Sequence, residues 1–212
     1  MERVLRIVPA PIEPDGDAAS SADDEKLVGA LRAREHWAAP ALVSRYGSHL
    51  RRVLIRVLGG NDGELADVLQ DVVVHAWESI GALSDARALK AWLTQIAIFT
   101  ARKAIRRRQR RRWLTFFDTV PEPELTIAVG PGAGELQEAA SCVYRIFERM
   151  PVDERLPFAL RMLEGMDLDE TAAACGMSVA TVRRRLVKGE RRFYKMARQF
   201  EALAPWLREE RK

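Results

Sequence analysis

The segment from Asp167 to Lys188 constrains this chain more than any other, because it predicts two short helices joined by a tight turn. Asp167 and Glu170 have the spacing of a capping box, in which each side chain satisfies a free backbone N–H at a helix start. Gly176 can adopt the positive φ that a sharp helix end needs, and Ser178 can cap the next helix. This order of cap, glycine and cap predicts a helix-turn-helix.

The second helix of this motif separates an apolar stripe from a cationic outer face. Val179, Val182 and Leu186 recur about one turn apart and predict the side that packs inward. The outer face and the helix start carry hydroxyl and cationic side chains at Ser178, Thr181, Arg183, Arg184, Arg185 and Lys188. Charge alone would also fit two surface helices with a solvated face, but the spacing of the caps and the glycine favours DNA binding.

Hydrophobic periodicity elsewhere predicts an all-α protein of two helical domains. Val68, Val72 and Ala76 recur at helical spacing, so even the β-branched run at 72–74 belongs to a helix and no strand is predicted. Helices are expected over 23–33, 37–58 and about 85–111. We expect a disordered tail over 1–22, a first domain over 23–112, a linker rich in proline and glycine over 113–134, a helix-turn-helix domain over 135–200 and a C-terminal tail over 201–212.

Several classes of protein are disfavoured by composition. No apolar run approaches the roughly 20 residues of a membrane span, and the N-terminus lacks a signal-peptide pattern, so we expect no membrane insertion and a cytoplasmic location. Cys142 and Cys175 are far apart and have no Cys or His partners at metal-ligand spacing. They are expected to be reduced and structural. We predict no metal, no cofactor and no catalytic residue.

The net charge of +4 hides a strong segregation of charge along the chain. Residues 1–30 carry seven acidic and three basic residues, and residues 113–142 carry five acidic residues and no basic one. The stretch 102–112 has eight basic residues in eleven, and 183–198 has eight more. Segregated cationic stripes are typical of polyanion binding, and two of them predict two contacts on one nucleic acid.

Three segments together carry a resemblance to a known family. ADVLQDVVVHAW (66–77) is similar to D-L-x-Q-E-x-F-x-x-A-W, and LKAWLTQIA (89–97) is similar to F-R-T-W-L-x-x-I-A. Residues 149–186 are similar to L-P-x-x-x-R followed by L-x-E-G-x-S-x-x-E-I-A-x-x-x-G-x-S-x-x-T-V-K-x-R-L. These are motifs of the sigma-2 and sigma-4 domains of bacterial RNA polymerase sigma factors of the extracytoplasmic-function group. The resemblance covers about residues 24–112 and 136–198, in the family's order.

The resemblance implies a factor that recognises and binds promoter DNA and that binds the clamp helices and the flap region of core RNA polymerase. It also implies an anti-sigma factor that holds the protein inactive. The polymerase-binding residues would be Asp67, Gln70, Asp71 and His75. The helix at 178–188 would bind the −35 element. The loop 81–87 and the long basic helix would bind the unpaired non-template strand of the −10 element, through Arg87, Lys90, Gln95, Arg102, Lys103, Arg106 and Arg107. Trp92 is expected in the core, because its spacing to Ile96 is helical.

The chain departs from the family pattern at Ile98-Phe99, where Arg-Asn is frequent, at Lys103, where an acid is frequent, and at Leu89, where phenylalanine is usual. These departures concern the −10 preference and the strength of melting. They leave the −35 module untouched.

Two other classes of function compete with that of a sigma factor. One is a helix-turn-helix regulator that works without polymerase, but the acid-and-amide face around Asp67 is a poor dimer seam, since such seams are usually apolar. The other is a nuclease with Asp67, Asp71 and Glu78 as metal ligands, for which no second helix supplies matching acids.

Overall fold

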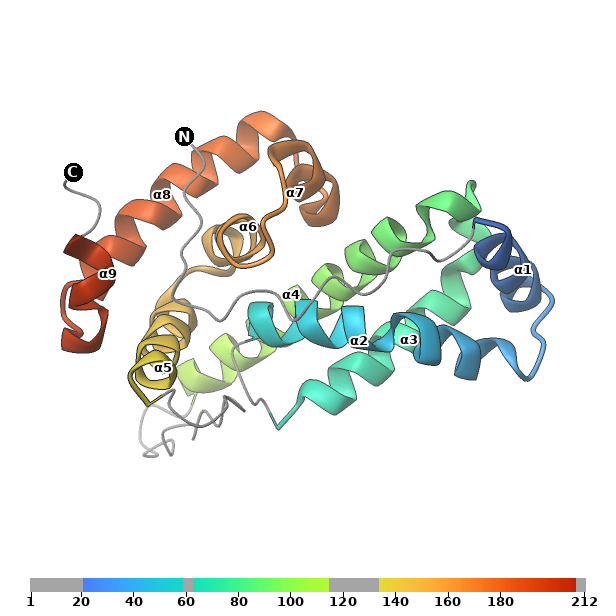
Figure 1. The fold of residues 1–212 in the computed structure, drawn as a ribbon, viewed down its shortest axis with the longest axis horizontal. Coiled ribbons are helices and arrows are strands. Elements are labelled where there is room, and N and C mark those ends of the chain that lie inside the picture. The colour runs from blue at the N-terminus through green and yellow to red at the C-terminus, as the bar shows by residue number, and fades with distance from the viewer. Residues whose placement is uncertain (1–20, 59–62, 115–133, 209–212) are drawn as a thin grey trace.

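The computed structural model describes residues 21–58, 63–114 and 134–208, and within these ranges every regular element is a helix. Figure 1 shows two groups of helices, joined where α4 passes beneath α6 and α7. The first group comprises α1 (Ser21–Arg32), α2 (Ala38–Leu58), α3 (Leu65–Ser79), the short 3-10 turns η1 (Ile80–Ala82) and η2 (Ala86–Ala88), and α4 (Leu89–Leu114). The second comprises α5 (Gly134–Arg149), α6 (Val152–Met162), α7 (Leu168–Cys175), α8 (Val179–Ala197), η3 (Glu201–Leu203) and α9 (Ala204–Arg208).

The first domain is a bundle of α2, α3 and α4 with α1 packed across one end. Leu50, Val72 and Leu93 are fully buried, one from each bundle helix. At the α1 end, the Tyr46 hydroxyl donates to Asp24 Oδ1 at 2.6 Å, and Arg45 lies 3.0 Å from the same carboxylate. Burial and this hydrogen bond raise the pKa of Tyr46 to about 12. The cluster anchors α1 to α2 by polar contacts beneath the apolar packing.

The second domain is built around three aromatic rings from different helices. Phe147 of α5, Phe158 of α6 and Phe193 of α8 are buried, with ring centroids 5.1 to 6.0 Å apart. Gly189 lets α8 approach α6 closely, because a Cβ there would lie 3.2 Å from the Glu154 carbonyl oxygen. Leu203 is also fully buried in this core. The expected C-terminal tail at 201–212 was therefore placed too early, since η3 and α9 belong to the second domain.

Helix α6 contains an internal proline. The helix begins at Val152, so Pro157 lies inside it and is buried. Proline has no N–H, and the carbonyl of Asp153, one turn earlier, therefore loses its intrahelical partner. The side chain of Asp153 lies beside the basic helix α4, as described below.

The two domains pack directly on each other. Leu156 and Leu160 of α6 and Cys175 of α7 join the apolar core of the first domain. The buried guanidinium of Arg155 donates from Nε and Nη2 to the Val57 carbonyl oxygen at 2.9 and 2.6 Å. The sequence predicted a linker over 113–134 between the two domains. Its residues 115–133 lie outside the described part of the chain, and the helices themselves make the contact.

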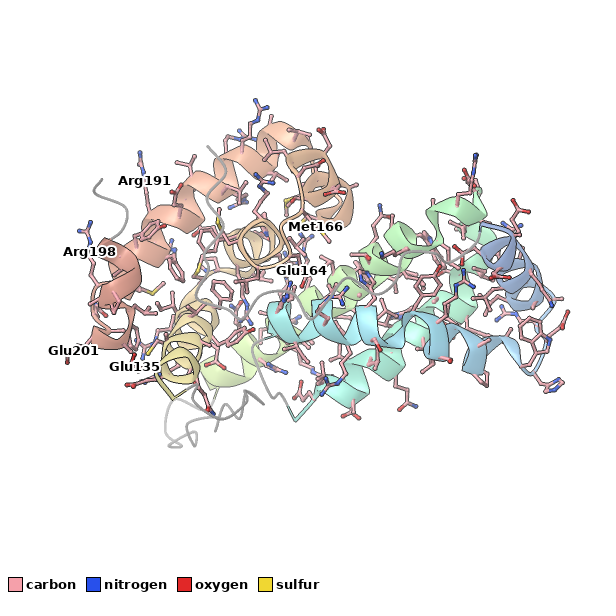
Figure 2. The ribbon with its side chains drawn as sticks, in the orientation of Figure 1. Glu135, Glu164, Met166, Arg191, Arg198 and Glu201 are labelled. Carbon is pink, nitrogen blue, oxygen red and sulfur yellow. The ribbon has the colours of Figure 1, made fainter. Side chains whose placement is uncertain are left out.

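A buried ion pair lies in the same interface. Arg56 Nη1 is 2.8 Å from Glu164 Oε1, and both side chains are about 8% exposed. Arg56 also donates to the Leu163 carbonyl oxygen. Figure 2 labels Glu164 and Met166 where the connection from α6 to α7 faces the first domain. A buried charge needs its partner to offset the loss of hydration, so separation of the domains must rehydrate both groups.

Candidate nucleic-acid and polymerase interfaces

The predicted helix-turn-helix is confirmed in its local geometry. Asp167 Oδ1 accepts from the Glu170 N–H, and Glu170 Oε2 accepts from the Asp167 N–H, both at 2.8 Å. Gly176 ends α7 in the left-handed region with φ of 61°. Ser178 caps α8 by accepting from the Thr181 N–H at 3.3 Å. The three local signals therefore begin α7, end it at a tight turn and begin α8, as the sequence predicted.

The start of α8 presents a linked series of polar side chains. The Ser178 and Thr181 hydroxyls are 2.9 Å apart, and Arg184 Nη2 donates to Thr181 Oγ1 at 3.2 Å. Val182 is fully buried on the opposite side, whereas Val179 and Leu186 are half-buried. This geometry holds Arg184 over the first turn of the helix, where a helix N-terminus and a guanidinium both favour an anionic ligand.

The outer edge of α8 carries a longer cationic stripe than the sequence reasoning assigned. Five of the exposed cations follow helical spacing along this edge: Arg184, Lys188, Arg191, Lys195 and Arg198. Figure 2 shows Arg191 and Arg198 pointing away from the body of the protein. Val187, 50% exposed, lies on the same side. The last three cations and Val187 are absent from the predicted site, although helical periodicity extended past Lys188 would have found them.

The cations of α4 are not a free series, because other elements supply carboxylates. Arg107 Nη2 and Arg108 Nε lie 3.0 and 3.4 Å from Glu64 Oε2. Arg102 Nη2 donates to the Cys175 carbonyl oxygen of the second domain at 3.3 Å. Gln95 and Lys103 are exposed, and Lys90 is half-buried. The basic run 102–112 contains no acidic residue in the sequence. In the folded protein, however, acids from other elements lie beside its arginines.

One carboxylate lies between the two basic helices. Asp153 Oδ1 is 3.3 Å from Arg106 Nη2 of α4, and Asp153 Oδ2 is 4.0 Å from Arg185 Nη2 of α8. Thus Arg106, expected at the −10 element, and Arg185, expected at the −35 element, share one acid. Exposed ion pairs of this kind contribute little to stability, but they compete with phosphate for the same guanidinium groups.

The loop before α4 holds Arg87 beside its helix cap. Arg87 Nε and Nη2 contact both oxygens of Asp85 at 2.9 to 3.2 Å, and the Arg87 N–H also donates to Asp85 Oδ1. These hydrogen bonds lower the pKa of the Asp85 carboxyl and raise the pKa of Arg87. Both side chains are exposed, so Arg87 remains accessible to an anionic ligand.

The exposed face of α3 contains most of the predicted polymerase-binding residues. Asp67, Gln70 and Asp71 are exposed on one side of the helix. Val74, 45% exposed, lies among them and was missed by sequence reasoning. His75 is half-buried instead, and its Nδ1 lies 3.3 Å from Thr100 Oγ1 of α4. The structure thus brings three of the four predicted residues together on the exposed face, and it turns the His75 side chain toward α4.

Both cysteines are free and buried, and burial raises the pKa of each thiol, that of Cys175 to about 11. Among the described residues, no group of three or more His, Cys, Asp or Glu side chains is placed to hold a metal ion. No helix in the described ranges is long and apolar enough to cross a membrane.

Comparison with known protein families gives two matches in chain order. Residues 42–111 match the family model of Sigma-70 region 2, and residues 140–193 match that of Sigma-70, region 4. The sequence is 27% identical over 174 residues to the ECF RNA polymerase sigma-E factor of Escherichia coli (strain K12), covering 78% of this chain and 89% of the relative. It is 27% identical over 179 residues to the protein of the same name from Haemophilus influenzae, covering 80% of this chain and 93% of the relative.

Two solved structures share the fold. CnrH, in complex with the cytosolic domain of CnrY, matches with a TM-score of 0.54 and 24% identity, over 82% of this chain and 96% of the CnrH chain. The sigma factor RpoE from Bartonella quintana, in complex with the anti-sigma factor NepR, matches with a TM-score of 0.52 and 20% identity, over 84% of this chain and 98% of the other. At these identities the likeness is one of fold.

Proposed function

Because the chain belongs to the sigma-70 family of RNA polymerase sigma factors, in the extracytoplasmic-function group, we propose a division of labour between its two domains. The second domain, from Gly134 to Arg208, binds the −35 element as duplex DNA. The first domain, from Ser21 to Leu114, binds core polymerase through α3 and the −10 element through α4. The protein acts as a non-catalytic initiation factor in the cytoplasm.

The observation that carries this proposal is the helix-turn-helix of α7 and α8. Its capping box and left-handed Gly176 hold α8 against α7, and the outer side of α8 is lined with cations. An α-helix fits the major groove, and arginine can donate two hydrogen bonds to guanine O6 and N7. Arg184, held over Thr181, is the candidate for base contact, and the cations farther along α8 suit phosphate contacts.

The −10 element is assigned to α4 and to the loop 81–87. Gln95 and Lys103 are exposed on α4, and the side chains of Arg106 and Arg107 are 50% and 57% exposed despite their ion pairs. Unpaired DNA needs cations along its backbone and accessible surfaces for its bases. Asp153 and the Cys175 carbonyl oxygen now contact Arg106 and Arg102, so the −10 strand requires the second domain to move away from α4.

The exposed face of α3 is assigned to core polymerase. Asp67, Gln70, Asp71 and Val74 form a mixed face with one apolar side chain among acids and an amide. Such a face suits a helical partner with cationic side chains around an apolar contact. We also propose an anti-sigma partner, because both solved relatives were captured with a partner chain, named as an anti-sigma factor for RpoE.

The test is co-purification with core RNA polymerase followed by run-off transcription on genomic fragments. The full chain should bind core enzyme and direct initiation from a defined set of fragments, whereas core enzyme alone should not. A chain that bound specific duplex DNA but neither core polymerase nor directed transcription would instead be a polymerase-independent regulator.

A further inference from the structure

An unexpected side chain on α4 is Phe99, which is 63% exposed. Its neighbour Ile98 is fully buried in the first-domain core, so the departure from the family pattern at 98–99 divides into one core residue and one surface residue. Among the described residues, Phe99 is the most exposed of the large hydrophobic side chains. Because most of the ring stays in water, the hydrophobic effect stabilises it less than it stabilises a buried ring.

The surroundings of Phe99 are polar and cationic. Residues three, four or seven apart on a helix lie on one side, so Gln95, Arg102, Lys103 and Arg106 flank the ring. Gln95, Lys103 and Arg106 are exposed with it. Trp92, two turns earlier, is half-buried and packs against the core. Ile96, one turn earlier on the same side, is also half-buried against the core, so Phe99 presents an exposed ring among hydrogen-bonding and cationic groups.

The chemistry of this arrangement discriminates between ligands. A protein partner that docked on Phe99 would have to desolvate the adjacent cations, and the apolar neighbours of the ring on α4, Trp92 and Ile96, are half-buried against the core and offer little area for the centre of an interface. An unpaired nucleic-acid strand offers a base for the ring and a phosphate for each flanking cation. Duplex DNA offers phosphates but no accessible base face, because its bases are stacked inside the helix.

We propose that Phe99 is a stacking platform for one unpaired base of the promoter non-template strand. This proposal rests on the assignment of α4 to the −10 element and adds a specific residue to it. The ring supplies a face for the base, Lys103 and Arg106 neutralise neighbouring phosphates, and Gln95 can hydrogen-bond an exposed base edge. Stacking of this kind tolerates any base, so Phe99 should favour strand separation more than sequence preference.

The experiment compares Phe99→Ala, Phe99→Leu and Phe99→Trp in the full chain assembled with core polymerase. The probe is a fluorescein-labelled single-stranded 20-mer of mixed sequence, and the same sequence as a duplex is the comparison. Phe99→Ala should weaken single-strand binding by about 5- to 150-fold, the loss typical of one stacked base. The single-strand affinity of Phe99→Leu should fall similarly, since leucine is apolar but has no ring. Phe99→Trp should retain or strengthen single-strand binding. Duplex binding should not change.

Val43→Ala on α2 is the matched control, because Val43 is another exposed apolar side chain of the same domain, on a helix that is assigned neither to DNA nor to polymerase. It should leave single-strand binding unchanged. Equal single-strand affinity for Phe99→Ala and the unmodified chain would overturn the proposal. So would a loss with Phe99→Ala that Phe99→Trp does not restore, or a loss of core binding with single-strand binding intact, which would make Phe99 a protein contact.

Failure of the broader function would look different. If the unmodified chain bound core polymerase but directed no transcription, the sigma-factor assignment would fail whatever the Phe99 variants did. Promoter opening is measured by the permanganate reactivity of unpaired thymines. If the unmodified holoenzyme initiated normally and the Phe99→Ala holoenzyme opened promoters equally well, only the stacking role would fail.

Discussion

At the residue scale, individual polar side chains set the geometry that the apolar core alone could not. The reciprocal bonds between Asp167 and Glu170 satisfy two backbone N–H groups at the start of α7, and the positive φ of Gly176 ends the same helix eight residues later. These contacts act within one or two turns, so each can be tested by a single substitution.

Asp167→Ala should lower the free energy of unfolding by about 0.5–2 kcal/mol, because the Glu170 N–H at the start of α7 loses its side-chain acceptor. Urea unfolding followed by circular dichroism measures the change. Asp169→Ala, an exposed position in the same turn that is not the cap, is the control and should have a smaller effect. Equal losses for the two variants would show that the cap does not stabilise α7.

Tyr46 carries a prediction about pH. Its pKa is raised from 10.0 to about 12 in the folded protein, so the folded state holds this proton more tightly than the unfolded state. The associated stability is present below pH 10 and is lost as pH rises toward 12. Tyr46→Phe should cost about 0.5–1.5 kcal/mol at neutral pH through the lost bond to Asp24.

The same variant should lose less further stability between pH 10 and 12 than the unmodified chain. Tyr144, whose pKa burial also raises to about 12, supplies the remaining alkaline loss. Unfolding curves at several alkaline pH values would check both parts. Parallel pH profiles for the two proteins would contradict the role assigned to Tyr46.

At the element scale, α8 separates neighbouring arginines by direction. Successive residues lie about 100° apart, so Arg183, Arg184 and Arg185 cannot all face one base pair. Arg185 turns toward Asp153 and Arg184 toward Thr181, while Arg183 is exposed on the flank. We therefore expect base contact from the first turns of α8 and phosphate contact from its outer edge.

Arg184→Ala should cost about 1–3 kcal/mol in binding of the preferred −35 duplex by holoenzyme and should relax preference at one position. Arg198→Ala, on the same edge four turns later, should instead weaken binding evenly across sequences and reduce the slope against log salt by about 0.9. Titrations of a duplex library at several salt concentrations would separate the two effects. A preference change with Arg198→Ala would reverse the assignment.

Helix α3 carries the corresponding prediction for polymerase. Asp71→Lys should weaken binding to core enzyme, because it reverses a charge on the exposed face of a helix anchored by buried Val68 and Val72. Asp169→Lys makes the same charge change on α7 and should leave core binding intact. Unchanged co-purification of Asp71→Lys with core enzyme, in a protein that still folds, would remove α3 from the interface.

At the scale of the whole molecule, the main finding is direct contact between the domains. Leu156, Leu160 and Cys175 complete the apolar core of the first domain, and Arg56 and Glu164 pair in the same interface. The second domain also occupies Arg102 and Arg106 of α4. Because the −10 and −35 contacts are assigned to different domains, binding to a promoter should require these contacts to break.

Cys175 reports this opening. It is buried in the interface and its thiol pKa is about 11, so at pH 8 it should react slowly with a thiol reagent in the free protein. In holoenzyme the separated domains should expose it and speed the reaction. The measurement uses a Cys142→Ser chain and a chromogenic aromatic disulfide reagent.

The control is Cys175→Ser, which leaves only Cys142 in the core of the second domain. Cys142 should react slowly in both states, because that core does not depend on the first domain. Equal rates for Cys175 before and after assembly with core polymerase would show that the domains keep this contact in the holoenzyme.

The helix-turn-helix could be predicted from sequence because its signals are local. Asp167, Glu170, Gly176 and Ser178 act through backbone groups within one turn, and the structure reproduces each of them. The exposed acids and amide of α3 followed equally from the 3.6-residue period of its buried positions. The division into two helical domains rested on the same periodicity, although the second domain continues past residue 200 into α9.

Contacts between distant residues were decided only by the tertiary structure. Glu64 and Asp153 pair with arginines 43 and 47 residues away, which turned an apparently acid-free cationic run into a partly neutralised one. Phe99 could not be recognised as exposed, because α4 is apolar on several sides at its start and cationic on all sides at its end. Composition and periodicity describe one helix at a time, whereas the partner of a charge and the exposure of a ring depend on which other helices pack beside it.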